Sequence, residues 1–205
     1  MHFDLGLKEQ NVVCESLGRG LQVFAPRKGG LEDFTDGNRT LITPDRPFLL
    51  LPSRFHQDLD QIRDGFRERL GEHLPNKQEG LFVARYAATI DHEVTLAEPA
   101  AIDRIASEQA FVNSVLQERF AYRTPGLKLL VLRVFQLSNA VTVPDDARTA
   151  GCKSWIELPQ AESCEAIPVL SDDQFSTRCD AIASALSIAT ESQPPIVAGT
   201  AQARG

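Results

Sequence analysis

Cysteine is scarce in this sequence, and its spacing excludes the common structural zinc sites. The four cysteines are Cys14, Cys152, Cys164 and Cys179. No two of them are three positions apart, and no histidine follows one at zinc-finger spacing. A chain of 205 residues buries roughly 70% of its unfolded surface, so it needs no disulfide or metal to fold. We therefore expect reduced thiols, no metal site and no cofactor.

Long apolar runs and an excess of positive charge are also missing. The longest apolar runs fall far short of the ~20 residues that cross a bilayer, and the start, MHFDLGLKEQ, has no charged segment followed by an apolar one. We expect a cytoplasmic protein that does not enter a membrane. Lys and Arg number 21 against 28 Asp and Glu, for a net charge of −7. This excludes a surface that binds a polyanion by bulk charge, but not a local basic groove.

The apolar pattern predicts one α+β domain, with a mixed or mostly antiparallel sheet flanked by three or four helices. Alternating or continuous apolar residues predict strands over 21–25, 48–51, 81–96, 127–137 and 141–143, and a short last strand or a turn over 154–158. Apolar residues three and four positions apart predict helices over 59–70, 102–120 and 172–186. The segment 7–17 fits either a helix or a first strand.

Composition along the chain adds two expectations. Nearly every residue of 127–137 is apolar, which predicts a strand covered on both faces of the sheet. Beyond Thr190 the chain turns to Ser, Gln, Pro, Gly and Ala. We therefore expect the folded domain to span 1–189 and a disordered tail to span 190–205.

The clearest local signal is the start of the last helix. Ser171 and Gln174 have the spacing of a capping box, and Leu170 and Phe175 flank the cap as a hydrophobic staple. Cys179 falls on the predicted buried stripe, together with Phe175, Ile182 and Leu186. We therefore interpret Cys179 as a small core residue and not as a nucleophile.

The first candidate binding site is Arg27-Lys28-Gly29-Gly30, after an apolar strand that we expect to end at Pro26. Glycines permit left-handed backbone, so that successive N–H groups converge on an anion, and the two cations would add charge-assisted hydrogen bonds to phosphate. The alternative is an ordinary charged turn. A P-loop is excluded, because the lysine precedes the glycines and no Ser or Thr follows them.

The second candidate is His56, which follows a predicted strand end within Arg54-Phe55-His56-Gln57-Asp58. It could act as a general base oriented by Asp58 or Asp60. The alternative is that Asp58 caps the following helix and His56 only bonds a loop carbonyl.

The third candidate is the end of the helix predicted over 102–120. Arg119 and Arg123 lie four positions apart, and with Tyr122 they could bind phosphate or stack on a base. The alternative is a helix C-terminus whose cations offset the helix dipole.

The fourth candidate is Gly151-Cys152-Lys153-Ser154-Trp155, which holds the only tryptophan. Lys153 could lower the thiol pKa of Cys152, and Ser154 could act as a nucleophile, although no G-x-S-x-G elbow surrounds it. The alternative is a packed turn anchored by Trp155. A metal-dependent nuclease core is incomplete here, because Gly151 stands where a second carboxylate is needed before Lys153.

Taken in order, these motifs resemble an uncharacterised bacterial family, domain of unknown function 1802. The matching pieces extend from about residue 7 to about residue 186: Leu7-Lys8-Glu9, Arg27-Lys28-Gly29-Gly30, Phe48-Leu49-Leu50-Leu51-Pro52, His56-Gln57, Leu132-Arg133-Val134 and Gly151-Cys152-Lys153-Ser154-Trp155-Ile156-Glu157. One departure is Gln10, where members of the family tend to have tryptophan.

The resemblance implies no established activity. It implies a link to DNA restriction–modification, because such domains occur beside restriction-type endonuclease domains, and it draws attention to the motif residues, including Gln57 and Lys153. Three hypotheses follow. The first is a nucleic-acid- or nucleotide-associated binding domain whose groove includes Arg27, Lys28, Arg54, Arg119, Arg123 and Lys153. The second is a small hydrolase that uses His56 as its base, with a carboxylate or Ser154 nearby. The third is a non-catalytic subunit that acts through a protein partner.

Overall fold

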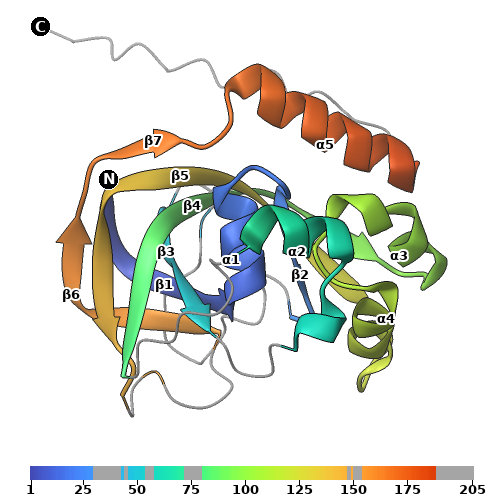
Figure 1. The fold of residues 1–205 in the computed structure, drawn as a ribbon, viewed down its shortest axis with the longest axis horizontal. Coiled ribbons are helices and arrows are strands. Elements are labelled where there is room, and N and C mark those ends of the chain that lie inside the picture. The colour runs from blue at the N-terminus through green and yellow to red at the C-terminus, as the bar shows by residue number, and fades with distance from the viewer. Residues whose placement is uncertain are drawn as a thin grey trace, which may run out of the picture.

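The computed structural model describes residues 1–29, 43, 46–53, 58–71, 80–146, 149 and 154–187 (Figure 1). The tail predicted over 190–205 lies outside this part of the chain, as do these candidate residues: Gly30, Arg54, His56, Gln57, Gly151, Cys152 and Lys153. No helix of the described residues is long and apolar enough to cross a membrane.

A seven-stranded mixed sheet forms the centre of the molecule. Its order is β2-β5-β4-β3-β1-β6, and β7 pairs with β5 outside this path. Strands β1 and β3 run parallel, and the other neighbouring strands are antiparallel. The bounds are β1 (His2–Gln10), β2 (Phe24–Arg27), β3 (Phe48–Ser53), β4 (Leu81–Leu96), β5 (Leu127–Pro144), β6 (Trp155–Ser163) and β7 (Ala166–Pro168). The predicted α+β class with a mixed sheet is confirmed.

The helices lie mainly beside one face of this sheet (Figure 1). They are α1 (Asn11–Gly18), α2 (Asp64–Leu70), α3 (Ala100–Arg104), α4 (Asn113–Ala121) and α5 (Asp172–Leu186). The segment 7–17, which fitted either a helix or a first strand, contains part of each, because β1 ends at Gln10 and α1 begins at Asn11.

The prediction of a single helix over 102–120 is wrong. Between α3 and α4 the chain forms a 3-10 turn at Ala106–Glu108 and a bridge from Phe111 to Ile62. Buried side-chain amides replace the helical hydrogen bonds there. Gln109 bonds both the N–H and the carbonyl of Phe111, at 2.7 and 2.6 Å, and the Gln22 carbonyl accepts from Ala110 N at 3.0 Å. The helical spacing of the apolar residues persists across this break, and it misled the prediction.

The sheet is buried on both faces. Phe48 and Leu50 of β3 belong to the core shared with the helices, whereas Leu49 and Leu51 belong to a second core formed by residues of the strands. In β5, the four consecutive residues of 129–132 are all buried, as predicted for a strand covered on both sides.

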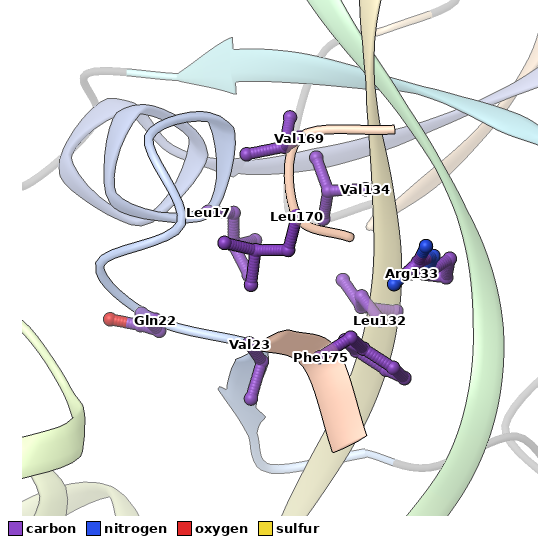
Figure 2. Close-up of a pocket in the computed structure, with 9 residues that line it drawn as sticks. All are labelled: Leu17, Gln22, Val23, Leu132, Arg133, Val134, Val169, Leu170 and Phe175. Atoms are coloured by element: carbon purple, nitrogen blue, oxygen red, sulfur yellow. The ribbon is translucent and has the colours of Figure 1, made fainter. Parts of the chain in front are cut away.

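The last helix is held by the signals that predicted it. The Ser171–Gln174 capping box is present, and the Arg133 guanidinium bonds Asp172 at 2.5 Å and lies 5.0 Å from the Phe175 ring centroid. Figure 2 shows Phe175 and Leu170 beside a small apolar pocket under this helix. The space open to the centre of a water molecule is about 10 Å³, enough for roughly one water molecule. The pocket is therefore a packing seam and not a ligand site.

Helix α1 packs against β4 at a glycine. A methyl group on Gly18 would lie 2.1 Å from the Tyr86 ring, so the ring occupies the space that the missing side chain leaves. The Tyr86 hydroxyl donates to the buried Glu15 carboxylate at 3.5 Å. Burial, together with the negative charge of Glu15, raises the pKa of Tyr86 to about 12.

We expect Gly18→Ala to lower the free energy of unfolding by about 1–3 kcal/mol, the usual cost of overpacking a core. The matched control is Gly65→Ala in α2, where an added methyl group meets no atom within 4 Å. That change should be neutral or stabilising by up to about 1 kcal/mol. Urea denaturation of both variants measures the difference, and equal effects would contradict the packing described for Gly18.

Candidate functional site

The end of β2 differs from its prediction. Pro26 does not end the strand but lies inside β2, opposite Leu129 of β5. Proline is tolerated there because β2 is an edge strand, where the missing N–H leaves no ladder bond unmade. Arg27 is therefore the last strand residue, and Lys28 and Gly29 follow it. The backbone at Arg27 is fixed by pairing with Lys128.

Arg27 forms a nearly buried ion pair with Glu9 at the end of β1. Its Nη1 lies 2.9 Å from Glu9 Oε2, and the two side chains are only 12% and 8% exposed. The other carboxylate oxygen accepts from Gln10 N at 2.8 Å. Strands β1 and β2 are not neighbours in the sheet, so this pair connects distant parts of it.

Lys28 binds the turn that follows α4. Its ammonium donates to the carbonyl oxygens of Phe120, Thr124 and Gly126, at 2.9, 2.5 and 2.9 Å. These bonds use all three donors of the ammonium group. The contact joins the first and third candidate sites, which are about ninety residues apart in the sequence.

Arg119 completes the junction between β2 and α4. Its Nη1 donates to the Pro26 carbonyl at 3.2 Å, and its guanidinium lies 4.6 Å from the Phe111 ring centroid. Burial lowers the pKa of Arg119; the charge of Glu9 opposes this shift, and that of Arg27 adds to it. We call Glu9, Arg27, Lys28 and Arg119 the strand-end cluster. Arg27 and Arg119 both interact with the Glu9 carboxylate, and Lys28 follows Arg27 and binds the turn after α4.

Tyr122 and Arg123 lie just outside the strand-end cluster. Tyr122 follows α4 and is 56% exposed, and the exposed Arg123 adopts a positive φ of 58°. The Arg123 guanidinium lies 5.0 Å from the Tyr122 ring centroid. The predicted residues Arg27, Lys28, Arg119, Tyr122 and Arg123 are thus brought together.

Ser154 and Trp155 lie on the other side of β1. The Ser154 carbonyl accepts from Lys8 N at 2.6 Å, and Trp155 pairs with Leu7. The Trp155 ring packs edge-to-face on Phe48, with centroids 4.8 Å apart. Trp155 therefore anchors the start of β6 against the core.

The end of β1 contacts three segments that are far apart in the sequence. Lys8 Nζ donates to Thr149 O at 2.8 Å, Glu9 binds Arg27, and Gln10 pairs with Ser53 at the end of β3. Glu9 is absent from our predicted site residues. Its signal was available, because Leu5, Leu7 and Glu9 alternate along one strand, which places the carboxylate on the same face as the two buried leucines.

A second concave surface lies along α2. This groove of about 580 Å³ is lined by Asp60, Ile62, Arg63, Asp64, Gly65, Phe66, Arg67, Arg69, Ser107 and Val112. Its charges largely offset one another, since Arg67 pairs with Asp64 and lies 3.9 Å from Asp60. Arg63 bonds the Phe111 carbonyl and Asn113. The groove therefore has less unbalanced charge than the strand-end cluster.

The described cysteines differ in their surroundings. Burial raises the pKa of Cys14, and it raises that of Cys179 to about 11, which agrees with Cys179 as a packing residue. The hydrogen bond between Cys164 Sγ and the Ser138 hydroxyl, at 3.2 Å, lowers the pKa of the Cys164 thiol. Among the residues 1–29, 43, 46–53, 58–71, 80–146, 149 and 154–187, no three His, Cys, Asp or Glu side chains form a metal-binding group.

The family can now be assigned. A model described as "Domain of unknown function (DUF1802)" matches residues 6–181. The chain belongs to this family. The match includes the strand-end cluster together with Tyr122 and Arg123.

Two solved structures resemble the DUF1802 chain distantly. They are the crystal structures of ASCH from Zymomonas mobilis and of a mutant form of that same protein. Both are 8% identical to this chain and cover 86% of it, with 92% and 94% of their own chains aligned and TM-scores of 0.39 and 0.41. Similarity at this level establishes neither a shared fold nor a shared function. No curated protein matches the sequence.

The buried pair at the end of β1 gives a stability test. Glu9→Gln removes the one carboxylate of the strand-end cluster and leaves two guanidiniums close together, so we expect a loss of about 3 kcal/mol in the free energy of unfolding. The control is Asp4→Asn on the same strand, because the Asp4 side chain is 51% exposed and bonds Arg46 at 2.7 Å. It should cost less than about 1 kcal/mol. Equal losses in urea denaturation would contradict the account.

The cysteine environments give a reactivity test. We expect iodoacetamide to alkylate Cys164 faster than Cys179, and Cys14 slowest, because only the thiolate reacts and Cys14 is buried. Ser138→Ala should slow the alkylation of Cys164 and leave the alkylation rate of Cys179 unchanged. Peptide mass mapping at pH 7.5 measures the rates, and a Cys179 rate equal to that of Cys164 would show that these environments are wrongly described.

Proposed function

We propose that this protein binds nucleic acid or a nucleotide, with the strand-end cluster and Arg123 on the phosphate side of the ligand. The observation that carries the proposal is the charge balance of the cluster. Arg27, Lys28 and Arg119 lie within one network of contacts in which Glu9 is the carboxylate. An anion that approaches the strand-end cluster meets positive charge, although the whole chain has a net charge of −7.

Different cations of the corner would serve different purposes. Arg27 and Lys28 have partners within the protein, so they raise the local potential and fix the geometry. Arg123 is exposed, and its guanidinium can reach a phosphate oxygen without breaking a buried bond. Arg123 is thus the side chain that we assign to direct phosphate contact.

The proposal does not extend to chemistry. Ser154 lies at the start of β6, whereas His56 is outside the described residues. The hydrolase hypothesis, the protein-partner hypothesis and the link to restriction–modification therefore stay predictions.

The test is the salt dependence of binding to fluorescein-labelled single-stranded RNA, single-stranded DNA and duplex DNA, followed by fluorescence anisotropy. We expect at least one of them to bind at 50 mM salt. The slope of log affinity against log salt concentration should be at least as steep as about −0.7 to −0.9, the value for the single phosphate contact assigned to Arg123. Arg123→Ala should weaken binding about 3- to 10-fold and make the slope shallower.

The control is Arg104→Ala, which removes the same charge from an exposed position on α3. It should leave the affinity unchanged within about twofold, since a distant exposed charge is largely screened by salt. The absence of binding to every probe and to ATP at 50 mM salt would refute the proposal. An equal loss in both variants would also refute it, because net charge alone would then govern binding.

A further inference from the structure

We infer that the turn after α4 is a rigid stacking platform for an unpaired base, with Tyr122 as the stacking ring and Lys28 as the residue that positions it. This inference rests on the proposed function and specifies the ligand class: a single-stranded nucleic acid or a free nucleotide, not a duplex. Three features of the turn carry it.

The first feature is the exposure of Tyr122. It is the only exposed aromatic side chain of the described residues, with 56% of its surface accessible. The other described aromatic residues, including Phe111 just before α4 and Phe120 within it, are buried or half-buried. A ring that contributes so little to the core offers a flat apolar face to a ligand, and every base has a face that can stack on it.

The second feature is the rigidity of the turn. The ammonium of Lys28 bonds the carbonyls of Phe120, Thr124 and Gly126, which come before and after Tyr122 in the sequence. In addition, Gly126 N donates to Phe120 O at 3.1 Å. These bonds close the turn on itself and tie it to the end of β2. Because the backbone around Tyr122 is fixed before a ligand arrives, less conformational entropy is lost on binding.

The third feature is the arrangement of Arg123. A non-glycine residue with a φ of 58° is unfavourable by itself and persists only where its surroundings impose it. This conformation accompanies a guanidinium 5.0 Å from the Tyr122 ring centroid. The cation lies over the ring, so a base that stacks at this exposed side chain has its phosphate within reach of the guanidinium.

These features select an unpaired base. In a duplex the base faces are covered by neighbouring bases, and only their edges are accessible. A single strand exposes base faces next to phosphates, which is the pairing of chemistries that Tyr122 and Arg123 offer. The site lies beyond α4 at the edge of the molecule in Figure 1, where a strand can approach it.

The test compares three probes by fluorescence anisotropy: a single-stranded oligonucleotide, the same strand with abasic positions, and the matching duplex. We expect the base-containing single strand to bind best. Tyr122→Ala should weaken its binding about tenfold and abolish its advantage over the abasic strand, whereas Tyr122→Phe should stay within about threefold of the unmodified protein. Leu59→Ala, which alters an exposed apolar residue elsewhere, should have no effect.

A double-mutant cycle tests the positioning role of Lys28. Lys28→Met should weaken single-strand binding, and the loss in Lys28→Met combined with Tyr122→Ala should be clearly smaller than the sum of the two single losses, because both changes remove the same platform. Additive losses would overturn that role and would show that Lys28 acts independently of the ring.

The outcomes separate this inference from the proposed function. If Tyr122→Ala binds all three probes as the unmodified protein does, while Arg123→Ala still weakens salt-sensitive binding, the platform is refuted and phosphate binding stands. Tighter binding to the duplex would equally refute the platform. If no probe binds at low salt, both proposals fall.

Discussion

The ion pair between Glu9 and Arg27 is the interaction on which the arrangement of the site depends. It joins the end of β1 to the end of β2, two strands that the sheet itself does not bring together. A nearly buried pair of this kind adds little net stability relative to apolar packing, but losing one partner is costly. It holds the Arg27 side chain, at the end of β2, against the end of β1, next to the point where Lys28 binds the turn after α4.

The fold and the site depend on each other through this corner. Lys28 and Arg119 both bind backbone carbonyls, so the charges that raise the local potential also hold α4 against β2. Such residues cannot turn outward to a ligand without breaking structure. Direct contact is left to the exposed Arg123 and Tyr122, whereas the half-buried cations supply charge and rigidity.

The sequence was most informative where the determining interactions are local. The Ser171–Gln174 cap and the apolar stripe that follows it depend on residues three or four positions apart. Helix α5 forms as predicted. The helix predicted over 102–120 failed because the amide of Gln22 reaches Ala110, 88 positions away. The sequence predicted that β2 ends at Pro26, but β2 is an edge strand and tolerates the proline inside it. The carbonyl groups that Lys28 binds lie more than ninety positions away from it in the sequence. Backbone carbonyls are the same at every residue, so the amino-acid types do not identify these partners.

The central claim is that one corner of the molecule, from the end of β2 to the turn after α4, contacts the ligand. The most direct measurement is an NMR titration of the isotope-labelled protein with a mononucleotide, followed through the backbone amide signals. We expect the largest shifts at Lys28, Gly29 and residues 119–126, with little change in α5. Shifts centred on the groove along α2, or no shifts at any site, would contradict this claim.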